Sequence, residues 1–357
     1  MDTFVFAGGG SGGHLFPAIA VARELQKRSA GCRIAFIGGS RAIEGDILGR
    51  ESFERRTLDA SPSSELWRRP IRFGWRTWGA TRSARRWLGE LRPRAVVGCG
   101  GFVSVPVALA ARRESTPLVL LEQNVVPGRA TSWLAGRASA VCTSFAATSG
   151  LLPRRTQVIF TGNPVREEIA ALLGQRDQRS GGPPTLLVLG GSQGASSVNT
   201  MLLRYIERHS AELGTWRIVN QTGSRDESMV RARYAEMPVK AEAAAFLVDM
   251  AANYSEASVV VSRGGATTLA ELACAGLPAV VIPYPGAIRD HQLRNAEVFA
   301  SSGAAGLVTD GADDEFRATL RPLLTDCDRR NRMAERMRQL ARPNAAQLVA
   351  DAILSAG

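Results

Sequence analysis

Several features that would define other protein classes are missing from this chain of 357 residues. No apolar run approaches the ~20 residues needed to span a bilayer, and a nearly uncharged stretch such as Phe102 to Ala111 falls far short of that length. The five cysteines are an odd number, lie far apart and form no CxxC, which argues against a disulfide framework or a zinc site. The N-terminal MDTFVFAGGG has no basic residue before its apolar run, so we expect a first strand, not a secretion signal, and a cytoplasmic protein.

The chain does contain enough apolar material for packed cores. Hydrophobic residues make up 45% of it and charged residues 22%, which argues against a disordered or collagen-like chain. A length of 357 residues exceeds what one ordinary core holds and predicts two domains. The net charge of +11 lies in one half, because residues 1–164 hold 23 basic against 11 acidic residues (+12) and residues 165–357 hold 21 against 22 (−1).

Short runs rich in Val, Ile and Leu alternate with helical stretches along the chain, as in βαβ units with parallel sheets. Each half opens with a strand that enters a glycine-rich turn and a helix, TFVFAGGGSGGH from Thr3 and TLLVLGGSQGAS from Thr185. We therefore predict an α/β fold of two Rossmann-like domains with parallel sheets. The expected strands are 4–7, 33–37, 95–98, 118–121, 140–143 and 158–161, then 186–189, 216–221, 244–248, 258–262 and 279–283.

Two further segments bear on how the domains are connected. We expect the chain to pass between the domains near Asn163, so that the polar stretch from Gln175 to Pro184 is a surface loop of the second domain. The last helix, from about Asn344 to Ala356, carries apolar residues at helical spacing and could pack on either domain.

The first glycine-rich turn is open to more than one interpretation. Gly8, Gly10 and Gly13 satisfy GxGxxG after a strand, as in proteins that bind a dinucleotide pyrophosphate at a helix N-terminus. The second strand, however, ends FIGGS without the carboxylate that would hold a nicotinamide ribose. His14 follows at the start of the helix, where the helix dipole favours the neutral, basic imidazole. It is a candidate general base, and the alternative is a histidine that only caps the helix.

Two turns in the second half could hold phosphates. GGSQG at residues 190–194 offers backbone N–H groups and the Ser192 hydroxyl to an oxyanion, although it could be a plain tight turn. SRGGATTLAE at residues 262–271 could hold phosphates with its amides and Thr268 while Glu271 accepts hydrogen bonds from ribose hydroxyls. Taken alone, Glu271 could simply complement the helix dipole. No DxD-like pair of carboxylates lies near these turns, so we expect no essential metal and no cofactor.

Eight motifs together resemble a known family. They occur in the order found in the MurG family, the UDP-N-acetylglucosamine:N-acetylmuramyl-(pentapeptide) pyrophosphoryl-undecaprenol N-acetylglucosamine transferases of bacterial cell-wall synthesis. Departures from the family pattern are Leu121 in place of His or another ring, Phe102 in place of Tyr, and Val248 in place of a second Asp. The motifs are GGGSGGH at Gly8, CGGFVSVP at Cys99, LEQN at Leu121, GNPVR at Gly162, GGSQGA at Gly190, FLVDM at Phe246, SRGGATTLAE at Ser262 and DHQLRNA at Asp290.

The resemblance implies a GT-B fold of two facing Rossmann-like domains. Residues 1–164 with the C-terminal helix, about 343–357, would form an acceptor and membrane-docking domain, and residues 165–342 would bind UDP-GlcNAc. The implied reaction is an inverting displacement at the GlcNAc anomeric carbon by the C4 hydroxyl of the muramyl sugar, which converts undecaprenyl-linked lipid I to lipid II and releases UDP. The implied partners are UDP-GlcNAc, lipid I and an anionic membrane surface.

The resemblance also implies which residues bind the nucleotide. Leu247 would meet the uracil through its backbone, Arg166 would flank the nucleotide and Ser192 would bond the phosphate. Glu271 would hold the ribose. The other implied donor-binding positions are Ser11, Gly12 and Gly13 from the first domain and Ala266, Thr267, Thr268, Leu269 and Ala270 from the second.

The implied chemistry needs a base and a stabilised leaving group. Gln292 and Asn124 would bond the GlcNAc hydroxyls, and His14 would take the proton of the attacking hydroxyl. Helix N-terminal amides, with Ser192 and Thr268, would stabilise the departing pyrophosphate.

The stretch from Leu66 to Leu88 contains seven of the arginines, no acid and four of the six tryptophans. Trp67, Ile71, Trp75 and Trp78 would share one face of a helix, although Pro70 and Gly74 oppose a continuous one. A solvated charge run does not explain the tryptophans, and a core helix does not explain the arginines. The pattern favours docking on an anionic membrane over a nucleic-acid patch, so we expect a peripheral protein on the cytoplasmic face. The docking residues predicted are Trp67, Arg68, Arg69, Arg72, Trp75, Arg76 and Trp78.

Two alternative functions stay open at this point. Another GT-B activity, such as a UDP-sugar epimerase or a glycolipid synthase, would share the donor site but would not be expected to keep LEQN together with GNPVR. A protein that binds anionic polymers is supported only by the basic first half, and the glycine-rich turns with Glu271 argue against it.

Overall fold

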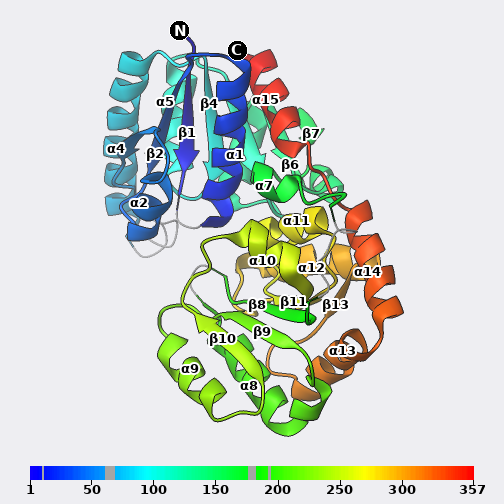
Figure 1. Cartoon of the computed structure of the whole chain (residues 1–357). Coiled ribbons are helices and arrows are strands. Elements are labelled where there is room, and N and C mark those ends of the chain that lie inside the picture. The colour runs from blue at the N-terminus through cyan, green and yellow to red at the C-terminus, as the bar shows by residue number, and fades with distance from the viewer. Residues whose placement is uncertain (10–11, 61–68, 176–181, 192–193) are drawn as a thin grey trace. The chain divides into compact units, whose positions relative to one another are not determined.

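The computed structural model describes the chain except for residues 10–11, 61–68, 176–181 and 192–193. It divides into two compact units (Figure 1). The first comprises Met1–Arg166 and Asn344–Gly357, and the second comprises Glu167–Pro343. The chain therefore passes from the first unit to the second after Arg166. The C-terminal helix, red in Figure 1, belongs to the first unit.

The first unit is built on a seven-stranded sheet in which every pairing is parallel. Its strand order is β3-β2-β1-β4-β5-β6-β7. The strands are β1 (Thr3–Gly8), β2 (Arg33–Gly38), β3 (Glu54–Thr57), β4 (Ala95–Gly100), β5 (Leu118–Glu122), β6 (Ala140–Thr143) and β7 (Val158–Phe160). The helices are α1 (Gly12–Arg28), α2 (Ala42–Leu48), α4 (Pro70–Leu91), α5 (Ser104–Arg113), α6 (Arg129–Leu134), η1 (Ala135–Arg137), η2 (Ala146–Leu151) and α15 (Ala345–Ala356).

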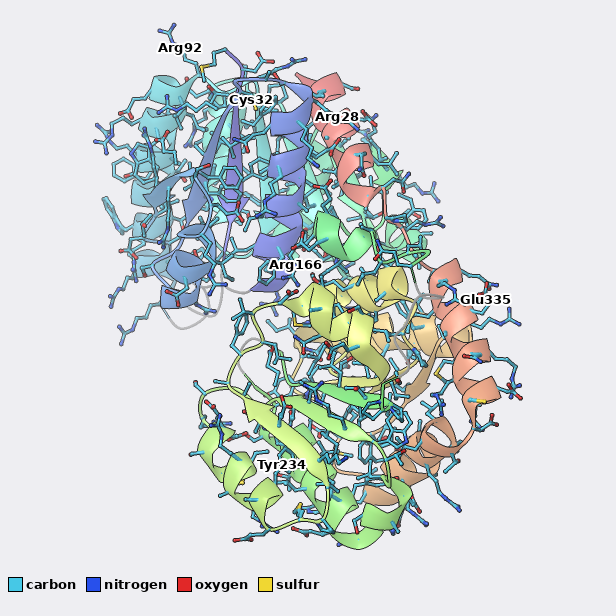
Figure 2. The ribbon with its side chains drawn as sticks, viewed as in Figure 1. Arg28, Cys32, Arg92, Arg166, Tyr234 and Glu335 are labelled. Carbon is cyan, nitrogen blue, oxygen red and sulfur yellow. The ribbon has the colours of Figure 1, made fainter. Side chains whose placement is uncertain are left out.

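Each face of the first sheet is covered by its own helices. On one face, α1 and α15 pack over Phe4, Phe6 and Phe36, and on the other, α4 and α5 pack over Val5 and Val96. A parallel sheet covered on both faces needs strands that are apolar throughout, which is why β1 reads TFVFAG and is buried at every position. Arg28, labelled in Figure 2, lies at the end of α1 and bonds Asp351 of α15. The C-terminal helix is therefore held against α1 by a polar contact as well as by apolar packing.

The second unit is built on a six-stranded parallel sheet with the order β10-β9-β8-β11-β12-β13. Leu186, Val188 and Val259 form its core together with apolar residues of α8 and α13. The strands are β8 (Thr185–Leu189), β9 (Arg217–Gln221), β10 (Lys240–Ala244), β11 (Ala257–Ser262), β12 (Ala279–Val281) and β13 (Ala305–Leu307). The helices are α7 (Glu167–Ala170), α8 (Ser196–His209), η4 (Ser210–Glu212), α9 (Glu227–Ala235), α10 (Met250–Glu256), α11 (Ala266–Ala275), η5 (Ile288–Asp290), α12 (His291–Ser301), α13 (Asp313–Thr325) and α14 (Cys327–Gln339).

The predicted pair of Rossmann-like parallel-sheet domains is confirmed, with three differences in its strands. The expected strand 244–248 is wrong, because β10 ends at Ala244 and the apolar residues after it lie beyond the strand. The sequence pattern did not predict β3, whose ERRT is charged and alternates in burial at the sheet edge, or β13, which has only three residues. Most of the expected loop 175–184 lies outside the described residues.

Strand order fixes where ligands can bind in such sheets. In each sheet the order of connection reverses once, between β1 and β4 in the first unit and between β8 and β11 in the second. The loops at the carboxyl ends of these strands diverge and leave a crevice that can hold a ligand. The glycine-rich turns after β1, β8 and β11 are therefore at the positions where each unit can best bind a ligand.

Candidate active site

His14 lies at the reversal point of the first sheet. It is the third residue of α1, is half-buried, and its Nδ1 atom is 3.0 Å from Oε1 of Gln123, which follows β5. Gly100, at the end of β4, has a φ of +99°, and a Cβ atom there would lie 2.9 Å from Cε1 of the His14 ring. Gly100 therefore leaves room for the imidazole at a position where most residues would be strained and would also displace the ring.

Asn124 is held by its neighbour Glu122. The Glu122 carboxylate is buried, and its Oε1 accepts hydrogen bonds from the Asn124 backbone N–H at 3.1 Å and from the Asn124 side-chain amide at 3.4 Å. Its Oε2 accepts a bond from the Gly128 N–H at 2.9 Å. The sequence analysis named Asn124 as a site residue and missed the two residues before it, although the LEQN motif contained them.

Glu44 was also missed. Its carboxylate is buried and accepts a hydrogen bond from the Gly39 N–H at 2.7 Å. A Cβ atom at Gly9 would lie 2.6 Å from the Glu44 oxygens, so the carboxylate packs directly against the first glycine-rich turn. Gly12 and Gly13 begin α1 just after that turn, whereas Ser11 lies outside the described residues.

Arg166 is the last residue of the first unit (Figure 2). Its guanidinium lies over the ring of Phe16 in α1, 4.8 Å from the ring centroid. This cation–π contact places Arg166 beside the helix that carries His14. A long cationic side chain at this position is compatible with the predicted contact to a nucleotide.

In the second unit, Gln221 connects two segments that were predicted to bind the nucleotide. Its Nε2 donates to the Gly191 carbonyl at 3.0 Å, and its Oε1 accepts from the Leu247 N–H at 3.3 Å. Leu247 therefore lies in the loop after β10 with its N–H already bonded to Gln221. Gly194, with a φ of +74°, packs so closely that a Cβ atom would lie 2.6 Å from the Thr222 carbonyl. Ser192 lies outside the described residues.

Helix α11 begins directly after the turn that follows β11, so Ala266, Thr267 and Thr268 form its first turn. Leu269 is fully buried and donates its N–H to the Gly265 carbonyl, so its side chain is not available to a ligand. Ala270 follows it in the same helix.

Glu271, in the second turn of α11, is 5% exposed. Its Oε2 accepts a hydrogen bond from the hydroxyl of buried Tyr254 at 2.9 Å. That bond fixes the orientation of the carboxylate in α11, the helix that follows β11. A ribose could donate hydrogen bonds to the oxygens of this carboxylate.

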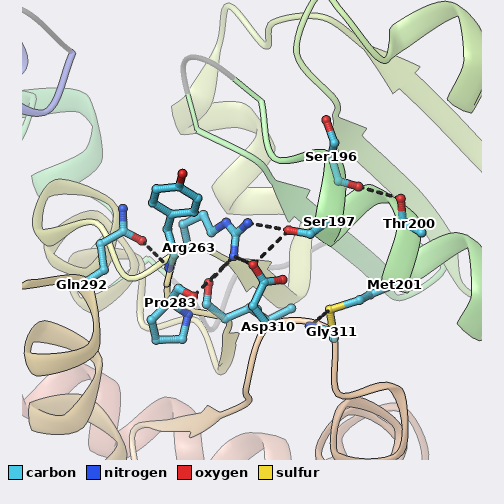
Figure 3. Close-up of polar contacts among 11 residues, drawn as sticks. Ser196, Ser197, Thr200, Met201, Arg263, Pro283, Gln292, Asp310 and Gly311 are labelled. Carbon is cyan, nitrogen blue, oxygen red and sulfur yellow. Dashed lines mark hydrogen bonds and ion pairs between the residues drawn. The ribbon is translucent and has the colours of Figure 1, made fainter. Parts of the chain in front are cut away.

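Gln292 at the start of α12 has a defined amide orientation (Figure 3). Its Oε1 accepts a hydrogen bond from the Tyr284 N–H at 3.0 Å, so its NH2 group points away from that contact and can donate. This arrangement is compatible with the predicted hydrogen bonds from Gln292 to sugar hydroxyls.

Arg263 ties together the loops of this edge (Figure 3). Its guanidinium donates to the Ile282 carbonyl at 3.1 Å, to Asp310 at 3.1 Å and to Ser197 at 2.6 Å. Ser197 in turn donates to Asp310 at 3.1 Å. The Arg263 and Asp310 side chains are each 12% exposed. One ion pair, largely but not fully buried, thus links the turn after β11 to α8 and to the loops after β12 and β13, a contact that the sequence pattern did not predict.

Helix α4 carries the predicted docking residues that the structure describes. It begins at Pro70, the helix position that proline tolerates best, and the residue before it, Arg69, is not helical, so Pro70 limits the helix as expected. Gly74 does not interrupt it, so that part of the expectation is wrong. Ile71, Trp75 and Trp78 are 77%, 69% and 55% exposed. The two indoles meet edge to face at 5.9 Å. Trp67 and Arg68 lie outside the described residues.

Arginines surround these apolar side chains. Arg72 is exposed, and Arg82 lies 5.9 Å from the Trp78 ring centroid. Arg69 is exposed at the helix N-cap, and Arg76 bonds Asp59. No helix within the described parts of the chain is both long and apolar enough to cross a bilayer. Among the same residues, no group of three or more His, Cys, Asp or Glu side chains is placed to hold a metal ion.

Comparison with known families defines the class of this site. The N-terminal domain of glycosyltransferase family 28 matches residues 4–143, and the C-terminal domain of the same family matches residues 185–350. The chain therefore belongs to glycosyltransferase family 28, and its two parallel-sheet units are those of the GT-B fold.

The similarity to one branch of this family runs through nearly the whole chain. The UDP-N-acetylglucosamine--N-acetylmuramyl-(pentapeptide) pyrophosphoryl-undecaprenol N-acetylglucosamine transferase of Stutzerimonas stutzeri is 40% identical over 357 residues, which covers 97% of this chain and 96% of the relative. The protein of the same name from Ectopseudomonas mendocina is 39% identical, with coverage of 96% and 95%. The crystal structure of Acinetobacter baumannii MurG superposes with a TM-score of 0.79 at 31% identity and covers 99% of this chain and all of that one. The predicted resemblance to MurG is confirmed.

A more distant solved structure shares the fold alone. The UDP-GlcNAc 2-epimerase from Neisseria meningitidis, bound to UDP-GlcNAc, gives a TM-score of 0.70 at 15% identity. The closer match to MurG separates this chain from the epimerase alternative.

Proposed function

We propose that this protein transfers GlcNAc from UDP-GlcNAc to the C4 hydroxyl of the muramyl sugar of lipid I and releases UDP. The observation that carries the proposal is that relatives named for this transfer match both units of the chain at 39–40% identity with almost complete coverage on each side. The 2-epimerase, whose structure holds UDP-GlcNAc, is only 15% identical to this chain.

The second unit is the proposed donor domain. Leu247, whose N–H is bonded to Gln221, would meet the uracil through its backbone, and Glu271, held by Tyr254, would accept hydrogen bonds from ribose hydroxyls. The first turn of α11 presents its backbone N–H groups at the helix N-terminus, where these donors and the helix dipole both favour a pyrophosphate. We expect these amides with Thr268 and Ser192 to stabilise the leaving UDP without an essential metal or cofactor.

His14 is the proposed general base. The attacking hydroxyl must lose a proton as its bond to the anomeric carbon forms, and a neutral imidazole at a helix N-terminus can accept it. Gln292 and Asn124 would bond the GlcNAc hydroxyls, and Gly12, Gly13 and Ser11 would contact the donor from the first unit. Arg166 would contribute its charge to the nucleotide.

His14→Ala tests this role. Because general-base catalysis contributes roughly 10²–10⁴-fold, we expect turnover to fall by at least about a hundredfold while UDP-GlcNAc still binds, as measured by transfer kinetics and calorimetry. His209→Ala, in α8 of the other unit, serves as the control. Near-normal turnover of His14→Ala would remove His14 as the base.

The first unit is the proposed acceptor and membrane-docking domain. Exposed Trp75 and Trp78 suit the headgroup depth of a bilayer, and arginines such as Arg72 and Arg82 suit anionic lipid. An acceptor carried on a polyprenyl chain stays in the membrane, so its enzyme must work at the surface. We place the protein as a peripheral enzyme at the cytoplasmic face of the membrane, with no nucleic-acid partner.

The experiment that tests the function follows both products. We would incubate the protein with labelled UDP-GlcNAc and detergent-dispersed lipid-linked muramyl-pentapeptide and measure label in the lipid fraction together with free UDP. The proposal predicts one UDP for each GlcNAc that enters the lipid. UDP release without labelled lipid would move the protein to another sugar-nucleotide reaction, and salt-sensitive binding to nucleic acid without donor affinity would support the polymer-binding alternative.

A further inference from the structure

The side chain of Gln123 joins His14 to the end of strand β4. Gln123 is buried, and its Nε2 donates a hydrogen bond to the Cys99 carbonyl at 3.2 Å. Its Oε1 lies 3.0 Å from Nδ1 of His14. The three residues come from different parts of the chain, the start of α1, the end of β4 and the residue after β5, and meet at the reversal point of the first sheet.

The chemistry of the three groups fixes the direction of both bonds. A backbone carbonyl can only accept, so the group that Gln123 presents to Cys99 is its NH2. The amide oxygen is then the group that faces His14, and an amide oxygen also can only accept. Nδ1 of His14 must therefore carry the proton of this hydrogen bond, and in the neutral ring Nε2 carries none.

The position of the ring is also restricted. A Cβ atom at Gly100 would lie 2.9 Å from Cε1 and 3.0 Å from Nδ1 of His14, so the ring packs against the bare Cα of this glycine. The imidazole is held by the hydrogen bond to Gln123 and by its contact with Gly100. These two contacts oppose a ring flip that would exchange the positions of Nδ1 and Nε2.

We propose that Gln123 is a positioning residue that holds His14 in the Nδ1–H tautomer, with Nε2 left as the nitrogen that accepts the proton of the attacking hydroxyl. The use of that nitrogen rests on the proposed role of His14 as base, whereas the tautomer itself does not. In other enzymes a carboxylate accepts the hydrogen bond from the second ring nitrogen of a catalytic histidine and so fixes its tautomer. Here a neutral amide, oriented by a backbone carbonyl, accepts that bond.

The test reads the tautomer directly. The chain has only three histidines, so the protein labelled with 15N-histidine gives three sets of imidazole signals, and the His14 set is identified by its loss in His14→Ala. Wild-type protein at a pH where the ring is neutral should show a protonated Nδ1 and a bare Nε2. A His14 signal with the proton on Nε2 would overturn the proposal, whatever the activity of the variants.

Two variants separate positioning from folding. Gln123→Leu removes the acceptor and should let His14 adopt the Nε2–H form, with kcat reduced about tenfold or more and the Kd for UDP-GlcNAc unchanged. Gln123→Glu keeps an acceptor beside Nδ1, so Nδ1 should stay protonated and turnover should exceed that of Gln123→Leu.

Equal kcat in wild type and Gln123→Leu would overturn the positioning role. A normal turnover of His14→Ala, with the Nδ1–H tautomer still observed in wild type, would instead overturn the base role alone.

Discussion

Individual side chains that are predicted to bind the donor are each held by another side chain. Glu271 is held by Tyr254, Leu247 by Gln221, and Asn124 by Glu122. In each case a second buried group fixes the orientation of a residue that the sequence motifs pointed to. The geometry of the site is therefore set as much by these supporting residues as by the ones that would touch a ligand.

Glu271→Gln tests the proposed ribose contact. A neutral amide has one acceptor oxygen in place of two charged ones, and charge-assisted hydrogen bonds are roughly twice as strong as neutral ones. We expect the Kd for UDP-GlcNAc, measured by calorimetry, to rise about tenfold, which corresponds to ~1.4 kcal/mol.

Glu212→Gln is a matched control for that variant. Glu212 also accepts a hydrogen bond from a tyrosine, Tyr205, at 2.6 Å in the same unit, but it lies in η4, away from the glycine-rich turns. Its loss should leave donor affinity unchanged. An unchanged Kd in Glu271→Gln as well would remove Glu271 from the donor site.

Helix α4 is an element whose proposed function can be tested without catalysis. Trp75→Ala with Trp78→Ala removes two exposed indoles, so stability should change little while binding to vesicles that contain anionic lipid should fall strongly in a flotation assay. Arg72→Gln should weaken binding by ~1 kcal/mol, about fivefold, with a smaller effect at high salt. Met229→Ala, at a 45% exposed residue of the second unit, is the control. Equal flotation of wild type and the double variant would contradict docking through α4.

The loops at the edge of the second sheet depend on the pair of Arg263 and Asp310. Arg263→Ala leaves a largely buried carboxylate without its cation, and breaking a fully buried pair costs roughly 3–5 kcal/mol. We expect a loss of about 3 kcal/mol in the stability of this unit, measured by chemical denaturation. The exposed pair of Arg233 and Glu207 is the control, because Arg233→Ala should cost less than about 1 kcal/mol. A similar small loss for both variants would show that Arg263 does not hold the loops.

The elements differed in how well the sequence predicted them. Buried parallel strands such as β1 and β8 are apolar after their first residue, a threonine, and were predicted nearly to their ends. Strand β3 was missed because an edge strand with charged residues lacks that signal, and 244–248 was wrong because the apolar FLV that follows β10 looks like a strand. Contacts such as Gln123 with His14, 109 residues apart, follow from the strand order and no local pattern contains them.

Across the whole molecule, the basic charge is concentrated in the unit that is proposed to dock on the membrane. The excess of basic residues lies in residues 1–164, nearly the same residues as the first unit, and the second half is close to neutral. A basic unit suits an anionic membrane and a lipid-linked pyrophosphate acceptor, whereas the proposed donor unit would bind a soluble anion through amides and would need no excess charge.

The cysteines report on the folding of both units. Cys32, Cys99, Cys142 and Cys274 are buried and Cys327 is exposed. Burial raises the pKa of Cys142 to about 12 and that of Cys274 to about 11, so these thiols stay protonated and unreactive at neutral pH. A thiol reagent should therefore modify one cysteine of the native protein rapidly and all five after unfolding, and Cys327→Ser should abolish the rapid reaction. Rapid modification of more than one cysteine in the native protein would contradict the packing described for the cores.

The most direct test of the proposed transfer is the configuration of the bond that it makes. The disaccharide would be released from the lipid product, and NMR would identify the acceptor carbon and the anomeric configuration of the new linkage. A single displacement assisted by His14 predicts GlcNAc joined to the C4 oxygen of the muramyl sugar with a configuration opposite to that in UDP-GlcNAc. Retention of the donor configuration, or attachment at another hydroxyl, would contradict it.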